Sequence, residues 1–172
     1  MAIKNFWSLN VDEAIVVDRI KEELGKNYEV FFPGNPRLKD IDLVVFDLKN
    51  GNAKTVQVKG SRSYLWDINE QRSWHIVPKD SIFKPKNKVD FFIFIWHVVY
   101  ETKKERSVKQ AYLVIPINDF KRKLKAKPMR HNKTYHFAFW TDFKNKVDDA
   151  RNPQSAKIDF SEFLDRFDLL IK

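Results

Sequence analysis

Asp42, Gln57 and Lys59 have side chains suited to chemistry, and they lie on two neighbouring segments. Asp42 is near the start of "DIDLVVFD", whereas Gln57 and Lys59 are near the end of "TVQVKG". Carboxylate and amide oxygens can bind a divalent cation, and a lysine ammonium can stabilise an anion. Whether the three residues act together depends on how the chain positions the two segments.

The two segments have the pattern of a β-hairpin. Their apolar runs, "IDLVVFDLK" at 41–49 and "NAKTVQVK" at 52–59, flank Asn50-Gly51. An Asn-Gly pair between apolar runs is the strongest short hairpin signal, because both residues accept the positive φ angles of a type I′ turn. We therefore expect two strands joined by a two-residue loop.

The register of this hairpin decides which side chains meet. A two-residue loop pairs Lys49 with Asn52 and places Asp42 directly opposite Lys59. Directly opposed residues share a face of the sheet, and so do residues two apart on one strand. The sequence therefore predicts a single patch formed by Asp42, Gln57 and Lys59.

A helix is expected before the hairpin, with further elements after it. In the helical segment 10–25, Asn10 is the expected N-cap and Glu13 follows three residues later. We expect strands at 28–32, 73–77, 89–100, 111–116 and 134–140, helices at 78–83, 117–127 and 159–172, and loops at 101–110 and 144–157. The pattern predicts an α/β fold with a mixed, mostly antiparallel sheet flanked by helices.

The net charge narrows the choice of partner. The chain has 32 Lys and Arg against 23 Asp and Glu, a formal net charge of +9. Basic side chains that neutralise phosphates release counterions, so this balance favours a nucleic acid over an acidic protein or a neutral metabolite. The alternative is a basic surface that only keeps the protein soluble.

The composition also excludes several kinds of site. Without cysteine, the chain has no disulfide, Cys-ligated zinc, iron–sulfur cluster or thiol nucleophile. It has no Gly-rich phosphate loop, and we expect no small-molecule cofactor. The longest apolar run, 89–100, is shorter than the roughly 20 residues of a membrane helix, and we see no signal peptide. We expect a cytoplasmic protein without a membrane partner.

On four of these residues the sequence resembles the PD-(D/E)XK nuclease superfamily. The resemblance rests on Glu13 in "DEAIVVDRI", on Asp42, and on Gln57 and Lys59 in "VQVKGS". It departs from the family where Gln57 replaces the usual acidic residue two before the lysine. A neutral amide offers one carbonyl oxygen, so it holds a divalent ion less strongly than a carboxylate does.

The resemblance implies a restriction endonuclease-like fold. It covers about residues 10–118, where the segments 89–95 and 111–116 look like the family's continuing sheet. Residues 119–172 form a C-terminal extension, and the whole chain, 1–172, is expected to be a single domain.

The resemblance also implies an activity, namely that of a Mg²⁺- or Mn²⁺-dependent endonuclease that hydrolyses DNA phosphodiester bonds. Asp42 would be the central metal ligand, with Glu13 binding directly or through water. Gln57 and the backbone carbonyl of Val58 would complete the metal site. Lys59 would orient the attacking water or stabilise charge on the phosphate.

The residues after Lys59 are candidates for binding the DNA, and they are Ser61, Arg62, Ser63 and Tyr64. Trp66 and Trp74 could stack on bases, although packing is the expected role of Trp74. The basic run in 121–127 is expected to be a solvated helix face first and a DNA contact second. A homodimer would supply two symmetric sites for the two strands of a duplex.

Each of these residues also has a structural explanation. Asp42 and Lys59 could form a cross-strand ion pair, and Glu13 could serve only as the capping partner of Asn10. Asp40 is the rival to Asp42 for the metal position. His97, in an apolar run, is expected to be a core histidine with its hydrogen bonds satisfied. The alternative functions are an inactive nucleic-acid-binding relative and a protein-interaction module.

Overall fold

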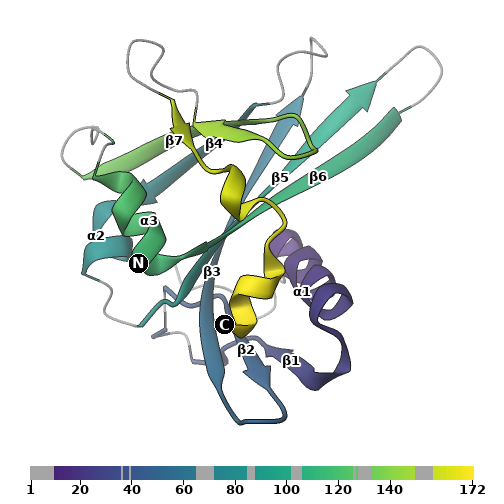
Figure 1. Ribbon diagram of the computed structural model, residues 1–172, viewed down its shortest axis with the longest axis vertical. Helices are drawn as coiled ribbons and strands as arrows, with labels where there is room; N and C mark the ends of the chain where they lie inside the picture. Colours follow the sequence, from purple (N-terminus) through teal and green to yellow (C-terminus); the bar gives the residue numbers. More distant parts are fainter. Residues whose placement is uncertain are drawn as a thin grey trace.

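Two β-sheets and three α-helices make up the part of the chain that the structure describes (Figure 1). This computed structural model describes residues 10–35, 37–38, 40–64, 72–84, 88–101, 106–125, 127, 133–149 and 157–172. The α-helices are α1 (Val11–Leu24), α2 (Lys79–Phe83) and α3 (Ile117–Leu124), and the short 3-10 helices are η1 (Gly25–Asn27), η2 (Ser161–Phe163) and η3 (Phe167–Ile171).

The first sheet is mixed and the second is antiparallel. Sheet A has the order β1 (Tyr28–Phe31), β2 (Leu43–Asp47), β3 (Ala53–Tyr64), β5 (Phe91–Glu101), β6 (Arg106–Pro116). Its pairs are antiparallel except for β3 and β5, which run parallel. Sheet B has the order β4 (Arg72–Pro78), β7 (Thr134–Thr141), β8 (Val147–Asp149), β9 (Ile158–Asp159). The predicted α/β class and a mixed, mostly antiparallel sheet are confirmed, but a second antiparallel sheet, which was not predicted, covers one face of it where helices were expected.

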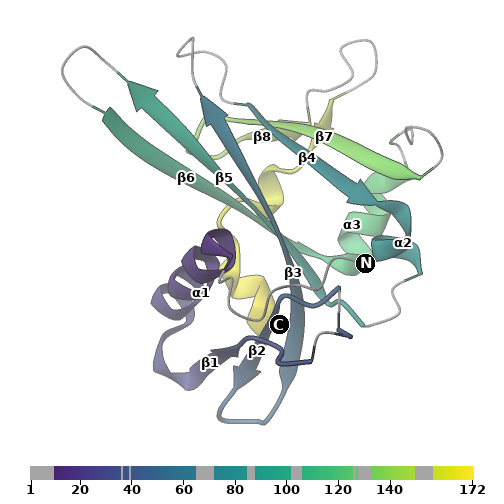
Figure 2. The ribbon, with the colours of Figure 1, turned by 180° about the vertical axis from the view of Figure 1, so that it is seen from behind.

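Helix α1 covers one face of sheet A (Figure 2). The Asn10 side chain accepts a hydrogen bond from the Asp12 N–H, which caps the helix start, and Gly25 ends the helix at a φ of 70°. Val16, Val17 and Ile20 pack on the apolar side chains of this face. Burying each such side chain stabilises the fold by about 1.5–3 kcal/mol.

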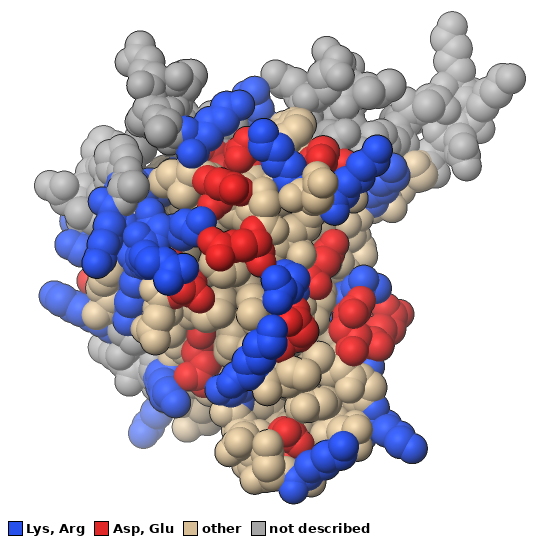
Figure 3. Space-filling view, in the orientation of Figure 1, with Lys and Arg blue, Asp and Glu red and all other residues tan. Residues whose placement is uncertain are grey.

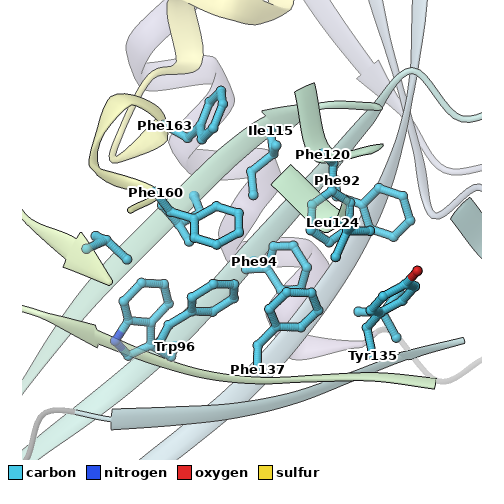
Figure 4. Close-up of a cluster of buried hydrophobic side chains, with 14 of the residues drawn as sticks. Phe92, Phe94, Trp96, Ile115, Phe120, Leu124, Tyr135, Phe137, Phe160 and Phe163 are labelled. Carbon is cyan, nitrogen blue, oxygen red and sulfur yellow. The ribbon is translucent and has the colours of Figure 1, made fainter. Parts of the chain in front are cut away.

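The opposite face of sheet A packs against sheet B. Phe92, Phe94 and Trp96 alternate along β5 and meet Phe137 and Phe139 of β7 in an aromatic core (Figure 4). The Phe94 and Phe139 rings lie 5.3 Å apart in a T-shaped arrangement, which adds to the burial energy. Strand β5 is therefore apolar on both faces, as its continuous run of apolar residues predicts.

Two predicted loops are wrong in part. Segment 101–110 contains the end of β5 and the first residues of β6, because these strands continue as a long antiparallel pair. Segment 144–157 contains β8, which pairs with β7 through Val147 opposite Thr141. Cross-strand hydrogen bonds outweigh the polar composition in both segments. Residues 102–105 and 150–156 lie outside the described part of the chain.

The predicted helix at 159–172 is also wrong. The segment holds β9 and two 3-10 turns, separated by Asp165 at a φ of 52°, whose N–H donates to the Tyr112 carbonyl at 2.9 Å. The apolar residues are buried as expected, but in two places. Phe160 and Phe163 join the aromatic core between the sheets, whereas Phe167 and Leu170 join the core under α1. A single helix has one apolar stripe, so it could not bury these side chains in both cores.

A buried imidazole in the aromatic core predicts acid sensitivity. The pKa of His75 is lowered to about 3, first by burial and then by the positive charge of Lys59. The unfolded chain takes up a proton near pH 6.5, which the folded chain resists. The free energy of unfolding should therefore fall as the pH drops from about 6.5 toward 3, by about 1.4 kcal/mol per pH unit from this residue.

Urea unfolding at a series of pH values measures this effect. His75→Gln should flatten the slope, whereas His136→Gln, which changes a histidine outside the core, should retain it. Parallel loss of stability in the wild-type protein and His75→Gln would contradict the assignment.

Candidate functional site

The hairpin forms, but with a longer loop than predicted. Asp47 N–H donates to the Asn52 carbonyl at 2.8 Å, so these two residues, and not Lys49 and Asn52, close the loop. The Asp47 and Asn50 side chains accept hydrogen bonds from the backbone N–H groups two residues on, both at 2.8 Å. These Asx turns satisfy the N–H groups of Lys49 and Asn52. Of Asn50 and Gly51, only Gly51 has a positive φ.

The longer loop changes the position of Asp42. Its N–H donates to the Val56 carbonyl at 2.9 Å, and its Oδ2 accepts the Val58 N–H at 2.8 Å. Asp42 therefore lies beside Gln57, and the predicted pairing directly opposite Lys59 is wrong. Strand β2 begins one residue later, so the Asp42 carboxylate takes the place of a backbone acceptor at the edge of β3.

Gln57, one residue before Val58, is buried and has an unpaired side-chain oxygen. Its side chain is 4% exposed, and its Oε1 has no hydrogen-bond partner among the described residues. Leaving a buried carbonyl oxygen unpaired costs about 1–3 kcal/mol. The structure thus places a carboxylate and an unsatisfied amide oxygen on adjoining residues of one sheet edge.

Lys59 and Ser61 follow on the same face of β3 as Gln57, the face turned toward sheet B. The Lys59 charge lowers the pKa of His75 on β4, which places the ammonium near that strand. Ser61 Oγ accepts the Trp74 N–H at 3.2 Å and ties β4 to β3. Beyond Gln57, strand β3 runs on without β2 beside it.

Glu13 approaches this stretch of β3 from the other layer. It is 7% exposed, lies in the first turn of α1, and accepts a hydrogen bond from the Asn10 side chain at 3.1 Å. Helix α1 packs on the Val56 and Val58 face, opposite to Gln57. The structure therefore places Gln57 and Lys59 on one face of β3, Asp42 at the edge of that strand through the Val58 N–H, and Glu13 on the opposite face, the α1 side.

A contact that sequence reasoning missed holds α1 against this part of β3. Asp12 packs directly on Gly60, where a Cβ would overlap its carboxylate. The Asp12 Oδ1 also bonds His97 Nε2 at 3.0 Å, and Gln110 lies 3.3 Å from the other ring nitrogen. His97 is thus a core histidine with partners, as predicted. A glycine inside a strand signals such a close backbone approach and could have revealed the contact.

The predicted DNA-binding residues are described in part. Ser61 is half-buried, as part of the link to Trp74. Arg62, Ser63 and Tyr64 belong to β3 and pair with β5, whereas their side chains and Trp66 lie outside the described residues.

The basic run at 121–127 is a solvated face in part, as expected, since Arg122 and Lys125 are exposed, but some of its cations form ion pairs. Lys123 pairs with Glu162 at 2.8 Å, Arg122 pairs with Asp119 at 2.8 Å, and the buried Lys127 pairs with Asp149. Figure 3 shows Lys and Arg side chains gathered on the side of α2 and α3, with acidic side chains across the rest of this face. Several cations of the run therefore stabilise the fold.

Comparisons with known proteins add no assignment. No protein-family model matches the chain, and no curated protein or solved structure matches it. Within the described ranges, no three His, Asp or Glu side chains group as a metal site, and the candidate set consists of two carboxylates and an amide. No helix in the same ranges is long and apolar enough to cross a membrane.

The Asp12–Gly60 contact yields a stability prediction. Gly60→Ala should lower the free energy of unfolding by about 1–3 kcal/mol, because the added methyl overlaps the Asp12 carboxylate. Urea unfolding measures the change. Gly34→Ala is the matched control, since a Cβ there meets open space.

A double-mutant cycle tests the cause. In Asp12→Ala the obstacle is gone, so adding Gly60→Ala should cost less than it does in the wild-type chain. Strictly additive losses would contradict the contact.

Proposed function

We propose that this chain is a metal-dependent endonuclease that hydrolyses DNA phosphodiester bonds, with its site on β3. The observation that carries the proposal is the buried Oε1 of Gln57, which has no partner among the described residues, one residue along β3 from the Val58 N–H that binds the Asp42 carboxylate. A fold that bears the cost of such an oxygen is best explained if the oxygen serves as a ligand.

The donor set fits a hard divalent cation. Asp42 and Gln57 supply oxygen atoms, which Mg²⁺ and Mn²⁺ prefer over nitrogen or sulfur. Glu13 lies on the α1 side of β3, opposite to Gln57, so it would bind the cation through water at the edge of the strand, and the Val58 backbone carbonyl would be a further ligand. When bound, the cation would polarise a phosphoryl oxygen and lower the pKa of a bound water.

The residues of the chain would orient the reactants around that cation. The Val58 N–H fixes the Asp42 carboxylate before any substrate arrives, which reduces the reorganisation needed for binding. Lys59 brings a positive charge two residues from Gln57, where it can orient the attacking water or stabilise charge that develops on the phosphate. The buried His75 stays neutral near pH 7, so it does not compete with Lys59 for an anion by carrying charge of its own.

Charge and architecture support DNA as the substrate. A net charge of +9 favours a polyanion. A mixed sheet with a carboxylate-bearing helix on one face is compatible with the restriction endonuclease-like fold that the sequence resembles. A homodimer would place two such sites on the two strands of a duplex.

Gln57 itself favours a second candidate function. An amide holds a divalent ion less strongly than the carboxylate it replaces, so a protein that binds nucleic acid without cutting it is the alternative. Cleavage and metal binding separate the two functions.

Cleavage depends on two residues in the proposal. Purified protein should nick plasmid DNA with Mg²⁺ and not with EDTA. Asp42→Ala should reduce cleavage to background, and Lys59→Ala should slow it by roughly 100- to 1,000-fold, the cost of removing one charge-stabilising group. Gel assays of initial rates give the measurement.

Matched variants control for general effects. Lys54→Ala removes another half-buried lysine from β3 and should leave the rate within about twofold. Asp40→Ala tests the rival carboxylate. Salt-sensitive DNA binding without any cut would favour the inactive relative, and loss of cleavage in Asp40→Ala alone would reassign the metal ligand.

The metal site can be tested without activity. Gln57→Met removes the unpaired oxygen at similar volume, so it should raise the melting temperature in EDTA. It should also abolish the rise in melting temperature that Mn²⁺ gives the wild-type protein. Differential scanning fluorimetry compares the two proteins. If Gln57→Met retains the full Mn²⁺ effect, then Gln57 is not a ligand.

A further inference from the structure

The outer face of sheet B exposes large apolar side chains on β4. Burial alternates along this strand, so Ser73, His75 and Val77 point into the core. Trp74 and Ile76 point outward and are 59% and 58% exposed. The expectation that Trp74 packs in the interior is therefore wrong.

Strand β7 extends this face with a second indole. Trp140 lies opposite Arg72, and Ala138 lies opposite Trp74. Because directly opposed residues share a face, Trp74 and Trp140 are diagonal neighbours across the two strands, with Arg72 beside them.

The charged residues around these side chains are those expected of a surface that binds a polyanion. We call platform the three residues Arg72, Trp74 and the partly buried Trp140, which share this face with five others of β4 and β7: Ile76, Pro78, Thr134, His136 and the buried Ala138. None of the eight is acidic. Exposed Lys133 lies just before β7, at the end away from Arg72, and Asp148, opposite Trp140 on β8, is buried and pairs with Lys146 at 3.5 Å.

The backbone of β4 links the platform to the strand that carries the candidate cleavage site. The backbone N–H of Trp74 donates to Ser61 Oγ, and Ser61 lies two residues along β3 from Lys59. Figure 2 shows β4 and β7 side by side, crossing over the strands of sheet A. Strand β4 is the edge strand of sheet B, so a DNA strand bound at Lys59 would pass around that edge to reach the outer face.

We propose that this platform binds an unpaired DNA strand, with bases stacked on Trp74 and Trp140 and phosphates held by Arg72. Indole rings stack on bases of any sequence, and neighbouring cations follow the backbone. Bases within a duplex offer only their edges in the grooves, so the platform selects unpaired segments. The inference rests on the proposed function only in making such a segment part of the nuclease's substrate.

Binding in EDTA, where the proposed nuclease cannot cut, tests the platform separately. Fluorescence anisotropy would follow a labelled oligo(dT) strand of about 16 nucleotides and a blunt duplex of equal length. Trp74→Ala should weaken binding of the single strand by roughly tenfold or more, the size of one base–aromatic stack. Trp74→Phe, which retains a ring, should recover most of the affinity.

Ile76→Ala is the matched control, because it removes an equally exposed apolar side chain without a π face. It should change the affinity for oligo(dT) by less than about twofold. Equal losses in Trp74→Ala and Ile76→Ala, or unchanged binding in Trp74→Ala, would overturn the platform. A melting curve for each variant shows that it is folded.

The two proposals fail in different ways. Trp74-dependent binding with no cleavage in Mg²⁺ would overturn the nuclease and leave the platform. Cleavage by a protein whose oligo(dT) binding ignores Trp74 would overturn the platform and leave the nuclease. A Trp74 effect that is equal on duplex and single strand would overturn the selectivity for unpaired DNA.

Discussion

Strand β3 packs against α1 on one face and faces sheet B on the other, and the rest of the architecture follows from that constraint. Side chains alternate along a strand, so Val56 and Val58 face the helix while Gln57 and Lys59 face sheet B. The apolar half of the alternation anchors α1 and closes one core. The polar half carries the candidate site, where β2 has ended and β4 approaches β3.

The position of Asp42 shows how a structural bond can prepare a functional group. Its carboxylate accepts the Val58 N–H that a continued β2 would have satisfied through its backbone. The same bond that ends the hairpin therefore fixes the carboxylate in place. Gln57, by contrast, is buried without an equivalent donor, and this imbalance between adjoining residues is what makes the edge of β3 a candidate site.

Sequence patterns predicted the regular elements well and their details less well. Alternation and apolar runs gave β4, β5, β7 and α1, since these depend on local spacing. The hairpin loop was wrong because the Asp47 and Asn50 side chains compete for backbone N–H groups, which an Asn-Gly signal does not reveal. The apolar residues of 159–172 have helical spacing, yet the segment is not an α-helix because they pack in two separate cores.

The candidate site was likewise predictable from the sequence only in part. Adjacency of Asp42 and Gln57 follows from the hairpin, but the partner of each depends on the register, which tertiary packing sets. The Asp12–Gly60 contact joins residues far apart in the chain, and Trp74 could be assigned to the surface only once the face of β4 was known. Local sequence carries no direct record of such long-range placement.

The segment 160–170, which contributes to both cores, affects how the protein folds during synthesis. Phe160 and Phe163 complete the layer between the sheets, while Phe167 and Leu170 complete the layer under α1. A ribosome delivers these side chains after every strand of sheet A, so a nascent chain carries two unfinished interiors until that segment emerges. Both cores are therefore completed only after residues 160–170 have been synthesised, later than every strand of sheet A.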